Sequence, residues 1–344
     1  MKLFALLALP LLSLSVGALY NATVVYQSPD PLHLLFEDLV ARASGHLLLT
    51  ACNSSTLHSF DPSRSETGLT PIHTFPNCDG LMGIVEIEPD VFAVASGFID
   101  LIAKRGANMT VWTVDLNPSH SAPLVRKVAV VPNCSILDGF STIPGSPHLI
   151  LAADPGEGVV WQINLVTGAS RIAFDDPSMS VDGPPPALGV NGIHVRDGFL
   201  YYSNSDATTF SRIPVQLNAN EDMVRAGNAA AQLMSTAQPA GFDHEYDGFD
   251  FDAEGRVWAA THTGAVTLIT QRGDGSFEAE IVAGSLVGPS IIEEPSSAQF
   301  GRGSAKQAAT LYVTTAAGQL LAVDTSAGAP GSTEKCHVKQ PRCY

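Results

Sequence analysis

Residues Val190–Ser205, VNGIHVRDGFLYYSNS, carry the pattern that decides the fold. An Asn-Gly pair precedes one apolar stretch, an Asp-Gly turn follows, and a second stretch, Phe199–Ser203, ends in a small polar loop. Apolar stretches joined by tight Asp-Gly turns are typical of antiparallel hairpins. The segment therefore predicts two adjacent strands with polar residues at both ends.

The same unit recurs along the chain about every 50 residues, a period typical of propeller blades. Each repeat has a central apolar strand, with one strand before it and another after it in most repeats. The central strands are expected at His46–Ala51, Val91–Ala95, His148–Ala152, Phe199–Ser203, Arg256–Ala260 and Thr310–Thr314. We predict an all-β fold, a six-bladed β-propeller of four-stranded antiparallel blades. A seventh blade or a pair of β-sandwiches is the alternative, and Ala219–Thr236 is expected to be a helix in an insertion.

The N-terminal segment Met1–Ala18 has one Lys before an apolar run that ends in small residues. This pattern is typical of a secretory signal peptide. The run is shorter than the roughly 20 residues needed to span a bilayer, although an N-terminal anchor is the alternative. We expect residues 1–18 to be a cleaved signal peptide, residues 19–344 to be a single propeller domain, and the protein to be secreted.

Glycosylation sequons and cysteines agree with a secretory route. The sequons begin at Asn21, Asn53, Asn108 and Asn133. The 5 cysteines include no Cys-x-x-Cys motif, so neither a zinc site nor a redox pair is indicated. Disulfides are the expected use outside the cytoplasm. Cys78 and Cys134 both end a Pro-Asn-Cys triplet at the same place in neighbouring repeats, so we predict that they pair, and that Cys336 pairs with Cys343.

The chain is acidic, with 34 Asp and Glu against 18 Lys and Arg and a formal net charge of −16. The basic residues form no cluster, which disfavours nucleic acid and anionic membranes as partners. The predicted partner is a small molecule, and no membrane span is expected.

In a propeller the first strand of each blade lines the central channel, so residues at one phase of the repeat meet at one mouth. Aligning the repeats places at this mouth Glu37, Met82, Asp138, Asn191, Asp247 and, approximately, Ser297. A second series of loops contributes Asn53, Phe98, Asp154, Asn204, His262 and Ala316. Any one Asp-Gly or Asn-Gly pair could be an ordinary turn. Carboxylates that converge must be hydrated, protonated or neutralised, and oxygen ligands suit calcium, magnesium or manganese.

Other residues with chemical or ligand-binding potential give less information about function. A hydrolase triad has little support because the chain has no Gly-x-Ser-x-Gly motif. His194 lies inside a predicted strand and is interpreted as a packed or hydrogen-bonded histidine. The tryptophans Trp112, Trp161 and Trp258 recur at strand positions, so we expect them to pack between blades.

Three stretches resemble the regucalcin and gluconolactonase superfamily of six-bladed propellers: FEDLVARASGHLLLT from Phe36, PALGVNGIHVRDGFLYYSNS from Pro186 and YDGFDFDAEGRVWAATHTGAV from Tyr246. The resemblance covers nearly the whole chain after the signal peptide. It implies that Glu37, Asn191 and Asp247 hold a divalent cation, which could be calcium, magnesium, manganese or zinc. Leu137 stands where the lactonases of that family carry an Asn, which argues against a sugar-lactone substrate and for a more apolar one.

The stretches EPDVFAV from Glu88 and FSRIP from Phe210 look like the secreted fungal branch of this superfamily. Some members of that branch are similar to hetero-Diels–Alderases of tropolonic sesquiterpene biosynthesis. The resemblance implies a secondary-metabolite cyclase that orients a quinone methide-like diene and a terpene alkene in the propeller mouth.

A cycloaddition requires orientation, which contributes up to about 7–11 kcal/mol, and hydrogen-bond donors that polarise an oxygen. We expect Phe98 and Phe140 to shape the cavity and Asn191, Asn204 or His262 to donate hydrogen bonds, with no cofactor required. The alternatives are a divalent-metal-dependent lactonase or esterase, and a non-catalytic propeller that binds a ligand or protein.

Overall fold

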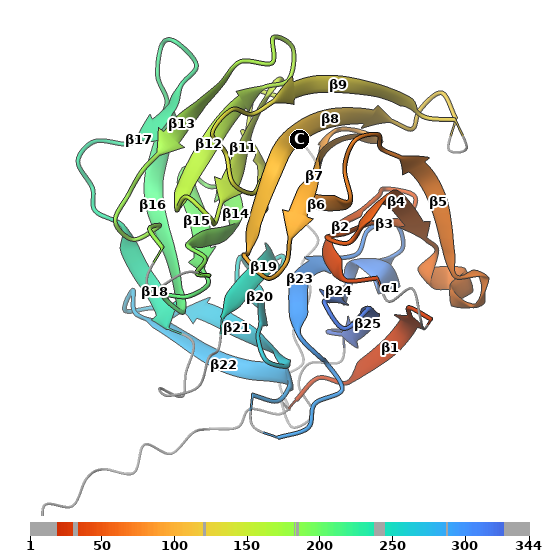
Figure 1. Ribbon diagram of the computed structural model, residues 1–344. Coiled ribbons are helices and arrows are strands. Elements are labelled where there is room, and N and C mark those ends of the chain that lie inside the picture. Colours follow the sequence, from red (N-terminus) through yellow and green to blue (C-terminus); the bar gives the residue numbers. More distant parts are fainter. Residues whose placement is uncertain are drawn as a thin grey trace, which may run out of the picture.

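The computed structural model describes residues 19–29, 34–119, 122–181, 183, 186–236, 245–286 and 288–326. These residues form six antiparallel sheets arranged in a ring (Figure 1). The prediction of an all-β propeller with four-stranded blades is confirmed; one sheet carries a fifth strand at its outer edge. The predicted signal peptide and the predicted Cys336–Cys343 bridge lie outside the described residues.

Each blade begins with the strand beside the channel and continues outward. The first two blades are β2 (Phe36–Ala41), β3 (Leu47–Ala51), β4 (Ser54–Phe60) and β5 (Leu69–Thr74), then β6 (Gly80–Glu88), β7 (Val91–Asp100), β8 (Arg105–Asp115) and β9 (Leu124–Val130). The next two are β10 (Phe140–Thr142), β11 (Leu149–Asp154), β12 (Val159–Asn164) and β13 (Ser170–Phe174), then β14 (Val190–Arg196), β15 (Phe199–Asn204), β16 (Thr209–Leu217) and β17 (Met223–Arg225), with β18 (Gln232–Thr236) also on β16. The fifth blade is β19 (Tyr246–Phe251), β20 (Val257–Thr261), β21 (Ala265–Gln271) and β22 (Phe277–Gly284).

The sixth blade closes the ring with strands from both ends of the chain. It comprises β23 (Pro295–Phe300), β24 (Thr310–Thr315) and β25 (Gln319–Asp324), and its outermost strand is β1 (Ala22–Gln27). Pairing β1 with β25 ties the first strand of the chain to the last. This closure was not predicted, because β1 lies ahead of the first repeat. Two short helices, η1 (Pro62–Thr67) and α1 (Ala305–Ala308), lie in loops.

Apolar side chains fill the space between each pair of neighbouring blades, and the described residues form one buried cluster at each of these junctions. Alternation along β3 shows why: Leu48 packs towards the second blade, whereas Leu47 and Leu49 pack towards the sixth. Trp161 and Trp258 belong to such clusters, and Trp112 packs beside another, as predicted. The six central strands begin within one residue of their predicted starts.

Two predictions were wrong. Residues Ala219–Thr236 form no helix; β17 and β18 both pair with β16, because edge pairing and burial of Met223 and Met234 outweigh the weak helical pattern. Cys78 and Cys134 are free thiols, so the predicted bridge between them is not formed. Each packs against a different inter-blade cluster, which keeps the two thiols apart.

No helix in the described part of the chain is long and apolar enough to cross a membrane. The asparagines of all four predicted sequons are exposed: Asn21, Asn53, Asn108 and Asn133.

Candidate functional site at the channel mouth

A β-bulge at the entrance of the inner strand turns side chains towards the channel. The register shifts between Phe36 and Leu39 in the first blade, and it shifts at the equivalent place in the second, fourth, fifth and sixth blades. A bulge re-aims side chains and is frequent beside functional sites. The bulged residues include Glu37, Met82, Asn191, Asp247 and Ser296.

The structure corrects two of the predicted mouth positions, Ser297 and Met82. In the sixth blade it places Ser296, and not Ser297, in the position equivalent to Asn191, because Ser297 already pairs with Thr314. Met82 is buried in the core between the second and third blades instead of lining the channel.

The glycines that follow Asp138, Asn191 and Asp247 allow neighbouring blades to approach closely. A Cβ on Gly139 would lie 2.5 Å from the carbonyl oxygen of Asn191, and one on Gly192 would lie 2.7 Å from that of Asp247. These glycines do not need an unusual φ angle; they need the absence of a side chain. At the mouth, the Asn-Gly and Asp-Gly pairs therefore allow close packing of neighbouring blades and do not form hairpin turns.

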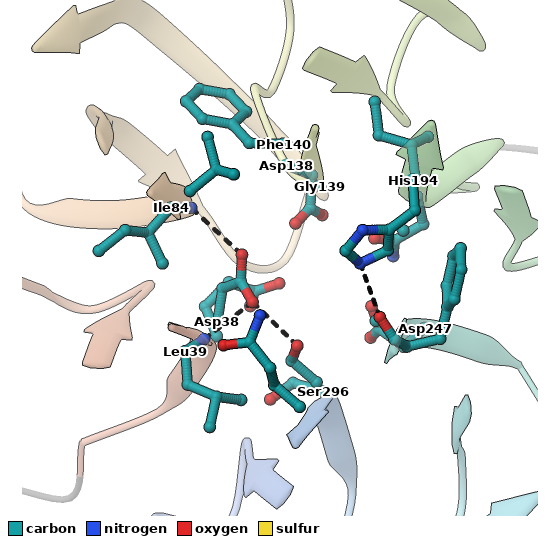
Figure 2. A pocket seen from close by; sticks show the side chains of 18 residues that line it. Asp38, Leu39, Ile84, Asp138, Gly139, Phe140, His194, Asp247 and Ser296 are labelled. Carbon is teal, nitrogen blue, oxygen red and sulfur yellow. Dashed lines mark hydrogen bonds between the residues drawn. The ribbon is translucent and has the colours of Figure 1, made fainter. Parts of the chain in front are cut away.

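Acidic side chains crowd the channel below this mouth. The lining includes Glu37, Asp138, Asn191 and Asp247 around a cavity of about 40 Å³ (Figure 2). Burial raises the pKa of Glu37 well above its usual value, and the negative charges of Asp138 and Asp247 raise it further. Burial likewise raises the pKa of Asp138, to which Glu37 is hydrogen-bonded. Both shifts favour protonation of this carboxyl pair.

Asp38 joins three blades. Its carboxylate accepts hydrogen bonds from the backbone of Leu39 (2.8 Å) and Ile84 (3.1 Å) and from the hydroxyl of Ser297 (2.9 Å). Burial raises its pKa to about 6, although these hydrogen bonds oppose the shift. Asp38 was not predicted from the sequence, because it stands beside Glu37 in the bulge, outside the aligned position of the repeat.

A second ring of polar residues lies deeper in the channel and ties successive blades together. Ser141 accepts from Val195 N (2.8 Å), Asp250 accepts from Phe300 N (2.9 Å), and Gln299 accepts from Ala41 N (2.7 Å). His194 Nε2 lies 2.8 Å from the carbonyl oxygen of Phe249, in agreement with its interpretation as a hydrogen-bonded histidine. These residues stand three positions after the mouth residues, a phase that the sequence analysis did not examine.

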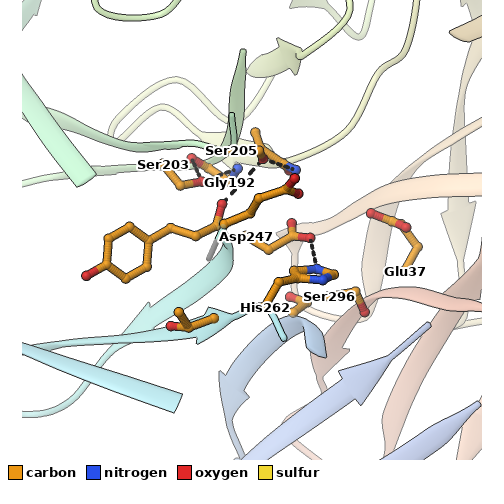
Figure 3. Close-up of polar contacts among 12 residues, drawn as sticks. Glu37, Gly192, Ser203, Ser205, Asp247, His262 and Ser296 are labelled. Atoms are coloured by element: carbon orange, nitrogen blue, oxygen red, sulfur yellow. Dashed lines mark hydrogen bonds and ion pairs between the residues drawn. The ribbon is translucent and has the colours of Figure 1, made fainter. Parts of the chain in front are cut away.

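His262 is brought to the mouth beside Asp247. Its Nε2 lies 3.2 Å from Asp247 Oδ2, and its backbone N–H donates to the carbonyl oxygen of Glu245 (Figure 3). Burial opposes protonation of His262, but the hydrogen bond and the charge of Asp247, helped by Glu245 and Glu294, raise its pKa overall. The carboxylate environment thus favours the protonated form of His262, in which both ring nitrogens are hydrogen-bond donors.

The other predicted site residues divide into lining and supporting groups. Asn191 lines the channel, and its Nδ2 donates to Ser205 Oγ over 3.0 Å. Phe140 also lines the channel. Asn204 holds a loop, because its amide donates to the carbonyl oxygens of Ser178 and Ser180 and accepts from Ala207 N. It has no amide hydrogen left for a substrate.

Asp154 and Phe98 also differ from simple mouth residues. The carboxylate of Asp154 is fully buried and accepts from the backbone of Ser135 and Ile136 and from Trp161 Nε1. It therefore organises the loop before the third blade. Phe98 lies on a projecting hairpin with 42% of its surface exposed.

The three predicted metal ligands, Glu37, Asn191 and Asp247, all line the channel, and a divalent cation held by them stays a prediction. Among the residues that the structure describes, no group of three or more His, Cys, Asp or Glu side chains could hold a metal. Glu37 is hydrogen-bonded to Asp138, and Asp247 to His262, so two of the three expected ligands are already engaged.

A larger groove opens beside the channel mouth. It has a volume of about 570 Å³ and is formed by loops of the fifth and sixth blades together with Leu35. Thr263, which follows His262, and Glu294 are part of its wall. Small-molecule sites usually occupy roughly 300–1,000 Å³, so this groove can accept an organic molecule that the channel cannot.

No protein-family model matches the chain. Two curated proteins are similar to it: "Putative hetero-Diels-Alderase" of Phoma sp, 24% identical over 84% of this chain and 85% of that protein, and "Putative hetero-Diels-Alderase asR5" of Sarocladium schorii, 25% identical over 69% and 63%. Among solved structures, regucalcin of Agrobacterium tumefaciens superposes with a TM-score of 0.60 at 16% identity, covering 90% of this chain and 95% of that one.

The chain has the six-bladed fold of the regucalcin type and is distantly homologous to these two fungal proteins. The match with regucalcin concerns the fold alone. The homology to the Phoma sp protein covers 84% of the chain.

Proposed function

We propose that this protein is an enzyme that orients two reactants for a hetero-Diels–Alder cycloaddition at the channel mouth. The observation that carries the proposal is the homology, over 84% of the chain, to a protein that bears the name of that activity. The substrates are proposed to be a quinone methide-like diene and a terpene alkene. Secretion through the signal peptide and glycosylation of the exposed sequons are part of the same proposal.

The geometry supports this chemistry. In the cycloaddition, two new σ bonds form from π bonds, and no atom leaves, so the protein need supply neither a nucleophile nor a leaving-group acid. It must hold two partners in a near-attack geometry and polarise an oxygen of one of them. The groove of about 570 Å³ has room for organic reactants, and His262 stands beside it.

The roles follow from the contacts. His262 donates a hydrogen bond to the diene oxygen and draws electron density from the diene. Asp247 is a positioning residue, because it orients the imidazole through Nε2 at 3.2 Å. In the imidazolium form the other ring nitrogen, Nδ1, is the proposed donor. Asn191, held by Ser205, provides a second polar group at the mouth.

The test uses the purified protein, a quinone methide generated in buffer, and a terpene alkene, with the product stereoisomers separated by chiral chromatography. One stereoisomer is expected to dominate with the wild type. His262→Gln is expected to lower the rate on the order of 10²-fold, the scale found when one oxyanion donor is removed. His46→Gln, which alters an exposed histidine paired with Asp61, is the matched control.

Two results would count against the proposal. A product mixture identical to that of the uncatalysed reaction would refute it. Lactone hydrolysis that is lost on chelation and restored by calcium, magnesium, manganese or zinc would instead support the metal-dependent lactonase or esterase.

A further inference from the structure

The β7–β8 hairpin projects beyond its own blade. β6 pairs with β7 only as far as Gly97, and β9 pairs with β8 only as far as Thr110. Beyond these points β7 and β8 continue alone, pairing Phe98 with Ala107 and Asp100 with Arg105. The two strands therefore extend past the rim of the second blade without a further strand paired on either side.

The hairpin reaches across the channel mouth to the opposite side of the ring. Figure 1 shows its tip near the centre, beside β19 and β23. Lys104 Nζ lies 3.8 Å from Glu245 Oε1, and Glu245 directly precedes β19 of the fifth blade. The carbonyl oxygen of Glu245 accepts the backbone N–H of His262, so the contact adjoins the proposed hydrogen-bond donor.

Contacts on both sides of the turn hold the projecting end of the hairpin. Arg105 forms an ion pair with Glu157 (2.8 Å) in the third blade, and the backbone N–H of Ile99 donates to Asp79 (2.8 Å). Asp100 closes the turn by accepting from Ile102 N and Ala103 N. The ion pairs Arg105–Glu157 and Lys104–Glu245 are both partly exposed, and exposed ion pairs are weak. The tip can therefore leave the mouth at low cost.

The tip is unusually apolar for an exposed turn. Ile102 is 88% exposed, Leu101 48% and Phe98 42%. Contact with water is unfavourable for such side chains, and contact with an apolar ligand lowers the free energy. Lys104, in the same turn, contacts Glu245 at the mouth.

We propose that the β7–β8 hairpin is a lid whose side chains Phe98, Leu101 and Ile102 form the apolar half of the substrate site, with Lys104 and Glu245 holding the lid closed. The inference rests on the proposed function for the identity of the substrate, a largely hydrocarbon molecule. The channel cavity of about 40 Å³ is too small for such a molecule, so the substrate is placed above the channel, where the groove of about 570 Å³ and this hairpin both border the mouth.

The first test measures binding of the neutral apolar dye Nile red by fluorescence titration. Leu101→Ser and Ile102→Ser are expected to raise its Kd at least about fivefold, as the loss of apolar contact predicts. The matched control is Val166→Ser: Val166 is 70% exposed and lines a separate apolar groove between the second and third blades. An unchanged Kd in both hairpin variants, or an increase of the same size in Val166→Ser, would overturn the proposal.

The second test reverses the charges of the latch. Lys104→Glu is expected to raise the Kd for Nile red, and the double variant Lys104→Glu/Glu245→Lys is expected to restore it. Amide hydrogen exchange at Leu101–Lys104 is expected to slow when the dye binds. A double variant as weak as the single one, or exchange that the dye leaves unchanged, would contradict the lid.

Neither readout requires turnover, so failure of the lid and failure of the proposed reaction are distinguishable. Dye binding that depends on Ile102 in a protein without cycloaddition activity would sustain the lid and refute the reaction. Stereoselective cycloaddition by Leu101→Ser and Ile102→Ser at the wild-type rate and selectivity would refute the lid alone.

Discussion

Adding one methyl group at Gly192 is expected to strain the junction between the fourth and fifth blades. The Cβ of Gly192→Ala would lie 2.7 Å from the carbonyl oxygen of Asp247 and 3.1 Å from Gly248 Cα. Both neighbours are backbone atoms of β19, which is paired with β20 and cannot rotate away as a side chain could. Relief therefore requires the two blades to separate.

The expected cost follows from typical overpacking. Inserting a methyl group into a tightly packed site costs about 1–3 kcal/mol, and backbone neighbours place this site at the upper end. The Gly-to-Ala change also lowers the entropy of the unfolded chain, which offsets about 0.4–1 kcal/mol. We expect a net loss of roughly 2 kcal/mol in the free energy of unfolding, or about a thirtyfold change in the folding equilibrium.

Urea unfolding followed by tryptophan fluorescence measures this loss. The control is Gly273→Ala, because a Cβ at Gly273 meets no atom within 4 Å; its stability should equal or slightly exceed that of the wild type. Equal unfolding free energies for Gly192→Ala and Gly273→Ala would refute the argument that glycine is required for close approach. A slower reaction in Gly192→Ala is also expected, since the strain displaces Asp247.

Three further predictions concern other parts of the molecule. Asn204→Ala is expected to lower the free energy of unfolding by about 2–3 kcal/mol, because three hydrogen bonds are lost and their buried partners stay unpaired. Calorimetry measures this stability, and an unchanged value would show that the loop does not need the amide. Burial lowers the pKa of His58, so the wild-type protein should lose stability as pH falls below about 6.5. The His58→Leu variant should lose less stability over the same pH range. If the urea midpoints of both proteins fall by the same amount from pH 7 to 5, the prediction is contradicted. Alkylation of the unfolded, unreduced protein should label Cys52, Cys78 and Cys134 as free thiols in peptide mapping, and a disulfide-linked peptide containing Cys78 and Cys134 would disprove it.

The sign of the His58 prediction follows from which state binds the proton. A buried imidazole with a lowered pKa stays neutral in the folded protein while the unfolded chain takes up a proton near pH 6.5. The unfolded state is then favoured as pH falls from that value towards the folded pKa.

Much of the architecture was determined locally by the sequence. The alternation of apolar residues in stretches such as Phe199–Ser203 sets which side chains face each neighbouring blade, and its repetition sets the number of blades. For that reason the central strands and the tryptophan packing could be predicted. The shared phase of Glu37, Asn191 and Asp247 also follows from the repeat, because equal phase in a ring means convergence on one axis.

Other features depend on contacts between residues far apart in sequence. Pairing of β1 with β25, the bulge that brings Ser296 to the mouth, and the link from Asp38 to Ile84 all arise only when the ring closes. The strands in Ala219–Thr236 form because β16 offers an open edge, which no local pattern reveals. The raised pKa values of Glu37, Asp138 and His262, and the contact of Lys104 with Glu245, were likewise decided by tertiary structure, since burial and charge at the mouth come from different blades.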